Sequence, residues 1–152
     1  MEPRRALKLS IVICNYNYGE YLGEAISSAL LVTATEQEII VVDDGSTDES
    51  RDIIRSFGSR IVAVYKDNGG INSAINEGFR HATGDVVIFF DSDDRLCPQV
   101  GTRVFDCWDD DVAKVQYLAN VVDRLGNPVG RVLPNFTKIP EHKDILPLPS
   151  QH

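Results

Sequence analysis

The chain alternates short apolar runs with amphipathic segments over residues 9–90. Four apolar runs predict strands over residues 9–15, 38–43, 61–65 and 85–90, and the first two have the continuous apolar character of buried strands. Three segments between them predict helices: 20–31, 48–57 and 71–82. Strands that alternate with helices in this way predict right-handed β-α-β crossovers. The expected fold class is therefore α/β, with a mostly parallel sheet flanked by helices.

Two local signals predict where helices begin and end. Ser46 and Glu49 have the S-x-x-E spacing of a capping box, which predicts the start of the helix over residues 48–57. Gly84 follows the helix over residues 71–82 and is expected to end it as a C-cap glycine. Both signals agree with short connections between strands and helices.

The pattern changes after the fourth strand. Residues 98–108 predict a helix, and residues 114–122 and 128–133 predict two strands around the turn RLGNP. Four prolines in sixteen residues then indicate an extended segment without a core of its own. We therefore expect one domain over residues 1–133 and an extended Pro-rich tail over residues 134–152.

The composition is that of an ordinary globular protein, and the charge limits its partners. Of 152 residues, 43% are hydrophobic and 25% are charged, and the formal net charge is −8 at pH 7. A negatively charged chain does not track nucleic-acid phosphates without help, so no nucleic-acid partner is expected. An anionic ligand is compatible with this charge if a cation lies between ligand and protein.

The amino terminus and the cysteines favour a cytoplasmic location. The segment MEPRRALKLSIVIC has two arginines before an apolar run. The run is short and is followed by NYNYGEY rather than by a small-residue cleavage site, so we interpret it as the first core strand. Cys14, Cys97 and Cys107 show no C-x-x-C spacing and are expected to be reduced thiols. Association with the inner membrane face could come from segments outside this chain.

Each predicted strand ends in a cluster of polar residues. The carboxyl ends of parallel strands meet at one edge of a sheet, and ligands bind in the crevice beyond that edge. Four clusters at this edge therefore indicate a single ligand site. The clusters are Asn15-Tyr16-Asn17, Asp43-Asp44-Gly45-Ser46, Asp67-Asn68-Gly69-Gly70 and Asp91-Ser92-Asp93-Asp94.

The cluster over residues 91–94 carries three carboxylates in four positions. A D-x-D turn can direct carboxylate oxygens at one divalent cation, and Mg²⁺ prefers one or two carboxylates together with waters and phosphate oxygens. The other interpretation is a solvated acidic turn before the next helix, with Asp94 as the helix-start residue. The three acids alone leave both interpretations open.

The other clusters give weaker indications of a ligand. Asp43 and Asp44 either are ordinary turn residues or accept hydrogen bonds from a nucleobase N–H or from ribose hydroxyls. The adjacent glycines of NGGINSAINEG let the backbone approach a ligand closely, although the dinucleotide fingerprint and the P-loop are both absent. Asparagines one turn apart could face the crevice, and nearby tyrosines either stack on a base or pack in the core. These residues are Asn72, Asn76, Tyr16, Tyr18 and Tyr21.

Four ordered motifs make the sequence similar to a known family. LSIVICNYNYGEYLGEAISSAL, EIIVVDDGSTDES, NGGINSAINEGFRHATGDVVIFFDSDD and Pro98 resemble the family 2 glycosyltransferases, and VQYLANVVDRLGNPVG resembles the stretch that follows the metal motif in bacterial members. The resemblance implies the GT-A (Rossmann-like) fold. It implies transfer of a sugar from a nucleotide-diphosphate sugar, expected to be a UDP-sugar, to an acceptor hydroxyl with inversion. It also implies Mg²⁺ or Mn²⁺, a saccharide or lipid-linked acceptor, and polysaccharide biosynthesis.

The resemblance also assigns roles to residues of the clusters. Asp43, with Asp44 beside it, would hold the base. Asp91 would reach the ribose or a metal-bound water, and Asp93 would be the direct metal ligand, with Asp91 as the second candidate for metal. Asn15, Tyr16 and Asn17 would border the nucleotide. That site comprises Asn15, Tyr16, Asn17, Asp43, Asp44, Asn68, Gly69, Gly70, Asn76, Asp91 and Ser92.

The sequence departs from the family pattern in three ways. Residue 14 is Cys where many members have Pro, and residue 75 is Ile where many have Arg or an aromatic residue. The general-base carboxylate, often in a Glu-Asp pair, has no counterpart, and the acids at 109–111 are interpreted as a solvated turn. We therefore expect a truncated GT-A domain, the donor-binding part of a longer enzyme. The alternative is a nucleotide-sugar-binding module without turnover. Self-association into a homodimer is expected if truncation exposes an apolar surface.

Overall fold

The computed structural model describes residues 6–109 and 111–133, and it divides into two compact units, Met1–Thr102 and Arg103–His152. The first unit contains a parallel sheet with its helices, and the second contains a two-stranded hairpin. The tail expected over residues 134–152 lies outside the described residues. The two units are considered separately below.

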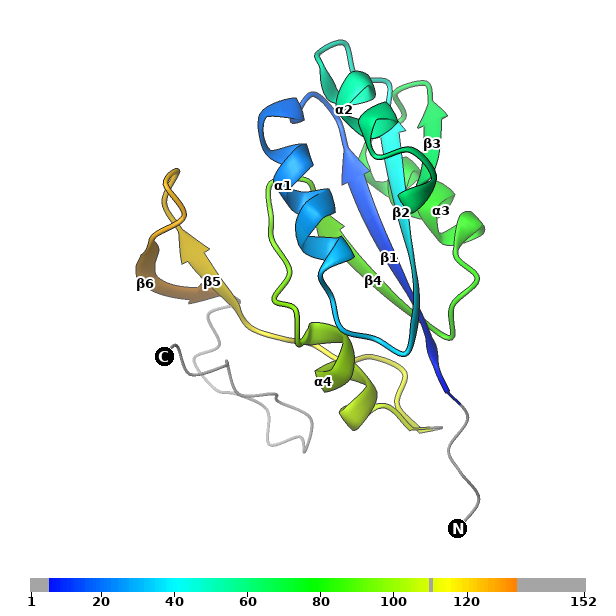
Figure 1. Ribbon diagram of the computed structural model, residues 1–152, viewed down its shortest axis with the longest axis vertical. Coiled ribbons are helices and arrows are strands. Elements are labelled where there is room, and N and C mark those ends of the chain that lie inside the picture. Colours follow the sequence, from blue (N-terminus) through cyan, green and yellow to red (C-terminus); the bar gives the residue numbers. More distant parts are fainter. Residues whose placement is uncertain (1–5, 110, 134–152) are drawn as a thin grey trace. The chain divides into compact units, whose positions relative to one another are not determined.

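The first unit is built on a four-stranded parallel sheet with the strand order β3-β2-β1-β4 (Figure 1). Its strands are β1 (Lys8–Asn15), β2 (Glu36–Asp44), β3 (Val62–Lys66) and β4 (Val86–Asp91). Each strand begins and ends within two residues of the range that the sequence predicts. The predicted α/β class with a mostly parallel sheet is confirmed.

Helices cover both faces of this sheet (Figure 1). α1 (Gly19–Leu30) and α2 (Ser50–Ser56) lie on one face, and α3 (Ile71–His81) lies on the other. A short 3₁₀ turn, Gly58–Arg60, precedes β3, and α4 (Val100–Cys107) confirms the last predicted helix. Within the described part of the chain, no helix has the length and apolar character needed to cross a membrane.

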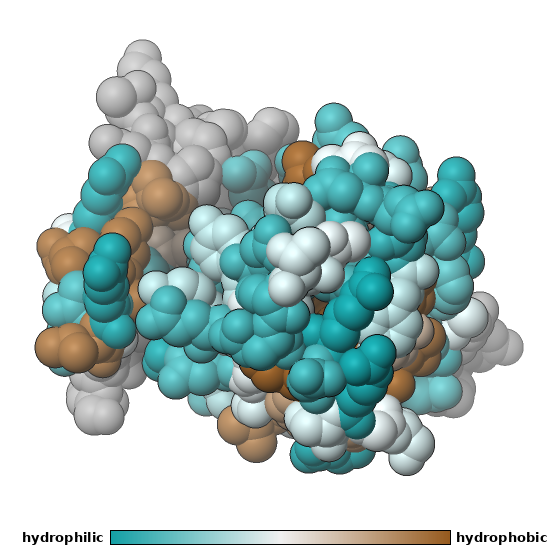
Figure 2. Space-filling view, turned by 90° about the horizontal axis from the view of Figure 1, so that it is seen from above, coloured by the Kyte–Doolittle hydropathy of each residue, from teal (hydrophilic) through white to brown (hydrophobic). Residues whose placement is uncertain are grey.

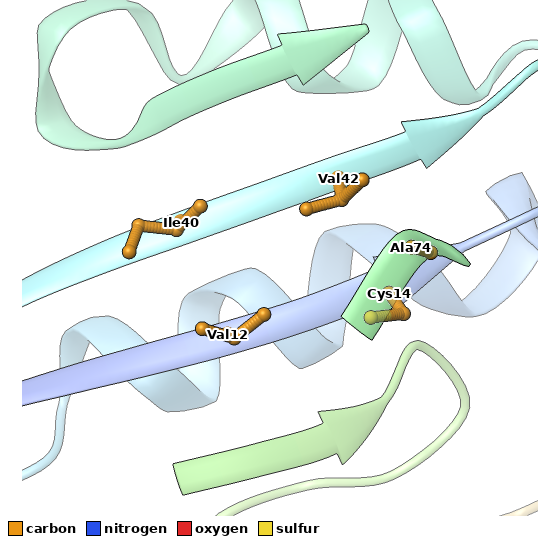
Figure 3. Close-up of a cluster of buried hydrophobic side chains, with 5 residues drawn as sticks. All are labelled: Val12, Cys14, Ile40, Val42 and Ala74. Carbon is orange, nitrogen blue, oxygen red and sulfur yellow. The ribbon is translucent and has the colours of Figure 1, made fainter. Parts of the chain in front are cut away.

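The core follows the two-residue period of the strands. One set of side chains packs together on the face covered by α3 (Figure 3): Val12, Cys14, Ile40, Val42 and Ala74. Ile11, Ile13 and Val41 alternate with them along the strands, so they point to the opposite face, and they are also fully buried. β1 and the second half of β2 are thus buried on both faces, as their continuous apolar sequences predict, whereas β3 at the edge of the sheet is exposed or half-buried along its length.

Two predictions about helix ends were wrong, because the residues concerned contact distant segments of the chain instead. α2 begins at Ser50 without a capping box, and the Ser46 hydroxyl instead accepts hydrogen bonds from Asn15 Nδ2 and Asn17 N. α3 ends at His81, before Gly84. Gly84 lies against β1, where a Cβ would be 2.6 Å from Ser10 Oγ.

The hairpin of the second unit pairs β5 (Ala119–Val122) with β6 (Pro128–Leu133) in antiparallel order. The sequence predicts β6 over the same residues. β5 is shorter than the predicted range 114–122, since its described pairing ends at Ala119 opposite Leu133. Asp123 shapes the turn by accepting hydrogen bonds from Leu125 N and Asn127 N.

The amino ends of the strands meet at a partly buried carboxylate. Glu38 accepts hydrogen bonds from Ser10 Oγ and Thr83 N, both at 2.6 Å, and pairs with Lys8 at 3.1 Å. Burial by itself raises the pKa of Glu38, but the hydrogen bonds from Ser10, Thr83 and Lys8 outweigh it and lower the pKa to about 2. The carboxylate therefore stabilises the fold when ionised.

This low pKa predicts a loss of stability in acid. An unfolded glutamate titrates near its ordinary value, so the contribution of Glu38 is fully present above about pH 5 and is lost as pH falls toward about 2. The shift from 4.5 to about 2 corresponds to about 3 kcal/mol of unfolding free energy. We expect Glu38→Gln to be less stable at neutral pH by up to this amount, and to lose less stability between about pH 5 and 3. Urea unfolding of both proteins at neutral pH, about pH 5 and about pH 3 measures the free energy of unfolding. An equal pH dependence in the two proteins would contradict the stabilising role of the Glu38 carboxylate.

The contact between α3 and the sheet leaves no room for a side chain at Gly78. A Cβ there would lie 2.3 Å from Val12 Cγ1 and 3.2 Å from Val42 Cγ2. On α1, by contrast, a Cβ at Gly23 would meet Ile53 Cγ2 at an ordinary 3.8 Å. The two helical glycines therefore form a matched pair for testing how closely α3 packs.

We expect Gly78→Ala to lower Tm and Gly23→Ala to raise it. Overpacking a core costs about 1–3 kcal/mol, which exceeds the gain of about 0.5–1 kcal/mol from replacing a helical glycine by alanine. Only the gain applies at Gly23. Thermal unfolding followed by circular dichroism measures both effects. A Tm for Gly78→Ala at or above that of the unmodified chain would show that α3 does not lie this close to the sheet.

Candidate functional site

A hollow of about 490 Å³ lies at the carboxyl edge of the sheet, on the face covered by α3. All four polar clusters predicted from the sequence contribute to it. Of the candidate donor-site residues, the structure brings together Asn15, Tyr16, Asp44, Asn68, Gly70, Asp91, Ser92 and Asp93. The other lining residues are Cys14, Tyr18, Ile71 and Ala74. Asn17, Asp43, Gly69 and Asn76 do not line the hollow.

The two adjacent aspartates at the end of β2 point to opposite faces of the sheet. Asp44 follows Val42 at a distance of two residues, so its side chain lies on the α3 face and lines the hollow. Asp43 is fully buried on the other face, where it pairs with Arg51 Nε at 2.8 Å and accepts hydrogen bonds from Asn15 Nδ2 and Ser46 N. Asp44 rather than Asp43 therefore lines the hollow.

Asp44 is held by a dense set of donors. Gly69 N and Gly70 N donate to its carboxylate at 3.0 and 2.7 Å, and Lys66 Nζ forms an ion pair with it. Burial raises the pKa of Asp44, but the hydrogen bonds from Lys66 and the two glycines outweigh it and lower the pKa. Asp44 is therefore an anion at neutral pH that connects β2 to the loop before α3.

Asp91 and Asp93 are exposed carboxylates on the rim of the same hollow. Asp91 lies opposite Cys14 in the parallel register, so it shares the α3 face with Asp44. Among the described residues, no group of three His, Cys, Asp or Glu side chains could hold a metal ion. Two carboxylates fit an ion such as Mg²⁺, which keeps several waters and also binds phosphate oxygens. Asp91 and Asp93 are the residues that could hold such an ion.

The negative charges of this region act on two neighbours. Burial raises the pKa of Asp94, and the charges of Asp93 and Asp91 raise it further. Burial likewise raises the pKa of the Cys14 thiol to about 11, with added effects from Asp91 and Asp44. Among the described residues that line the hollow, none is a lysine, an arginine or a histidine. A cation at this edge would offset the repulsion between these carboxylates and would favour an anionic ligand.

Asn17 connects two loops instead of lining the hollow. Its φ of 56° is left-handed, its Oδ1 accepts a hydrogen bond from Thr47 N at 2.7 Å, and its N–H donates to Ser46 Oγ at 2.9 Å. The loop between β1 and α1 is thereby fastened to the loop between β2 and α2. Tyr16 and Tyr18, on either side of Asn17, are each 47% exposed and line the hollow, where a planar group could stack on them.

The amino end of α3 forms another wall. Gly70 has a φ of 82°, a conformation that favours glycine, and Gly70 and Ile71 line the hollow. The partial positive charge of a helix amino end favours an anion at this position. Asn72 and Asn76 are exposed on α3 and do not line the hollow.

Three lining residues, Cys14, Ile71 and Ala74, were missed in the sequence, although a signal was present for Cys14. Cys14 continues the two-residue period of Val12 at the end of β1, which places it on the same face as Val42. The period alone does not say which face α3 covers. The sequence therefore could not show that Cys14 lines the hollow together with Asn15.

Comparisons with known proteins agree with this geometry. A sequence model of the family described as Glycosyl transferase family 2 matches residues 10–151. The chain belongs to glycosyl transferase family 2. A glycosyltransferase of Nostoc sp. (strain PCC 7120) is 40% identical to this family member over 122 residues, which are 77% of this chain and 38% of that protein. The chain spans about a third of the length of the curated relatives it matches.

Solved structures show the same fold. S. aureus TarS in complex with UDP-GlcNAc is 28% identical with a TM-score of 0.59, over 66% of this chain and 30% of that one. Glucosyl-3-phosphoglycerate synthase from Mycobacterium tuberculosis, in complex with Mn²⁺, UDP and glucosyl-3-phosphoglycerate, is 26% identical with a TM-score of 0.51, over 64% of this chain and 37% of that one. The predicted GT-A fold is confirmed for this family 2 member.

The raised pKa of Cys14 predicts an unreactive thiol. A rise from 9.0 to about 11 reduces the thiolate fraction at about pH 8 roughly a hundredfold. We expect iodoacetamide to modify the exposed Cys97 quickly and Cys14 at least about a hundredfold more slowly. Mass spectrometry of the digested protein measures both rates, and unfolding in urea serves as the control in which the difference disappears. Equal rates in the folded protein would contradict the burial of Cys14.

Proposed function

We propose that this chain binds a nucleotide-diphosphate sugar, a UDP-sugar in the first place, for metal-assisted transfer of the sugar to an acceptor hydroxyl with inversion. The observation that carries the proposal is one hollow lined by Asp44, Asp91 and Asp93 together with the amino end of α3. Family relatives with bound UDP-GlcNAc, or with Mn²⁺ and UDP, support it.

The nucleoside is assigned to the side of the hollow formed by β1 and β2. Tyr16 and Tyr18 expose half of their rings there, so either can stack on a base. Asp44 and the backbone of Asn68 and Gly70 form the wall beside them. We assign to Asp44 the contact with the nucleoside, and to Asp43 a supporting role through Asn15 and the loop at Ser46.

The diphosphate is assigned to the rim beside Asp91 and Asp93. These two carboxylates would hold Mg²⁺ or Mn²⁺, and a bound ion would neutralise the diphosphate and the charge that develops as it departs. The amino end of α3 faces the same hollow and stabilises negative charge there. Asp91 can alternatively accept a hydrogen bond from a ribose hydroxyl or from a metal-bound water.

We place the general base outside the described hollow. Asp44, Asp91 and Asp93 are the lining carboxylates, and each already has a role in binding the donor. Asp109 and Asp111 belong to the other unit, where Asp109 Oδ1 accepts a hydrogen bond from Asp111 N at 3.0 Å, as in a solvated turn. The saccharide or lipid-linked acceptor is accordingly assigned to a segment beyond these residues.

Asp93 provides the test of the metal site. We expect Asp93→Ala to weaken Mn²⁺-dependent binding of UDP by at least about tenfold, since it removes the proposed direct ligand. The fold should remain intact, because the substitution removes charge repulsion from the ligand-free site. Isothermal titration calorimetry with and without Mn²⁺ measures the affinity. Asp52→Ala is the matched control, because Asp52 is 83% exposed on α2 and pairs with Arg55.

Unchanged Mn²⁺-dependent binding in Asp93→Ala would refute the metal assignment. A chain that binds no UDP under any condition would refute the proposed function as a whole. A donor-hydrolysis assay with UDP-sugars then separates the two interpretations that the sequence left open. UDP-sugar binding without hydrolysis or transfer would favour a binding module without turnover over the transferase.

A further inference from the structure

Lys66 is the last residue of β3, and it contacts Asp44, one of the residues that line the hollow. Its ammonium group pairs with Asp44 and donates a hydrogen bond to Asp67 O at 2.6 Å. The side chains of Lys66 and Asp44 are 20% and 4% exposed, so the pair is mostly shielded from water. Lys66 does not line the hollow, and no motif of the sequence drew attention to it.

The pair fixes the backbone that forms this wall. The two oxygens of Asp44 accept the N–H groups of Gly69 and Gly70, which immediately precede α3. The space around this junction is small. A Cβ at Gly69 would lie 2.7 Å from Ser73 Oγ and 3.0 Å from Lys66 Nζ, and a Cβ at Gly45 would lie 2.7 Å from Asn68 N. The loop is therefore closely packed against Ser73, Lys66 and Gly45.

We propose that Lys66 is a positioning residue for the nucleotide, which acts by pairing with Asp44 and so holding residues 68–70 in the form that lines the hollow. This inference rests on the proposed function of the same site. Lys66 acts through Asp44 and the two glycine N–H groups, without touching the ligand.

The charges around the hollow give the physical reason. Asp44, Asp91 and Asp93 all line it, and no basic side chain within residues 6–109 and 111–133 does. Without Lys66, the carboxylate of Asp44 is a shielded and uncompensated anion near two others, and such a group moves toward water. Movement of Asp44 releases Gly69 and Gly70, and with them the amino end of α3. The ligand then has to order residues 68–70 as it binds, and this lowers its affinity.

The chain offers a matched control at the other end of the sheet. Lys8 pairs with Glu38 at 3.1 Å and is 26% exposed, so it resembles Lys66 in burial and in having a β2 carboxylate as partner. Its surroundings at the amino ends of the strands are remote from the hollow. Lys8→Met therefore removes a comparable ion pair without altering the proposed site.

The experiment measures UDP affinity in the presence of Mn²⁺ by calorimetry for Lys66→Met, Lys66→Arg and Lys8→Met. We expect Lys66→Met to raise the Kd about tenfold or more, because a charged hydrogen bond to a shielded group is lost. Lys66→Arg keeps the charge and should stay within about threefold of the unmodified chain. Lys8→Met should leave the Kd unchanged while lowering Tm. Amide exchange of Gly69 and Gly70, followed by NMR without ligand, should accelerate in Lys66→Met alone.

The outcomes are distinguishable. If the unmodified chain binds UDP and Lys66→Met binds it equally well, the role of Lys66 is refuted and the proposed function stands. Equal losses of affinity in Lys66→Met and Lys8→Met would also refute it, since they would reflect general destabilisation. Failure of Lys66→Arg to restore affinity would refute a role based on charge pairing. If the unmodified chain binds no UDP, the proposed function fails, and the role of Lys66 fails with it.

Discussion

Helix α3 is fastened to strand β2 by a carboxylate at each of its ends, and the hollow depends on the junction at Asp44, at the amino end of the helix. Asp44 accepts the N–H groups of the two glycines before the helix, and Glu38 accepts the N–H of Thr83 after it. A lysine pairs with each carboxylate. Between the two junctions, Gly78 lets the helix lie directly on β1. The position of α3 is thus set along its whole length, and α3 supplies one wall of the hollow.

The parallel register of β1 with β2 and β4 decides which side chains meet at the carboxyl edge. Cys14 lies opposite both Val42 and Asp91, so these three share a face of the sheet. Asn15 lies opposite Asp43 and donates its Nδ2 hydrogen bonds to Asp43 and Ser46, although Asn15 also lines the hollow. One face of the strand ends therefore meets the ligand, while the other ties the neighbouring loops together. Both kinds of residue come from the same short polar clusters.

The elements of the fold and the place of the site could be predicted because they depend on local patterns. Apolar runs and helical spacing located the four parallel strands and their helices, and polar residues after each strand located the edge. The predictions failed where a side chain that could act locally forms hydrogen bonds with a distant segment instead. Ser46 has the local spacing of a helix cap, yet its hydroxyl accepts hydrogen bonds from Asn15 and Asn17, which lie about 30 residues earlier. The two faces on which Asp43 and Asp44 lie could be assigned only once the face covered by α3 was known.

The left-handed residue Asn17 has a consequence for the thermodynamics of recognition. A non-glycine residue in this conformation costs of order 1 kcal/mol, and here two hydrogen bonds to the neighbouring loop hold it there before any ligand arrives. The loss of conformational entropy of this loop therefore belongs to folding rather than to association. Tyr16 and Tyr18 are presented by a preorganised loop, and an incoming planar group does not have to order the backbone that carries them.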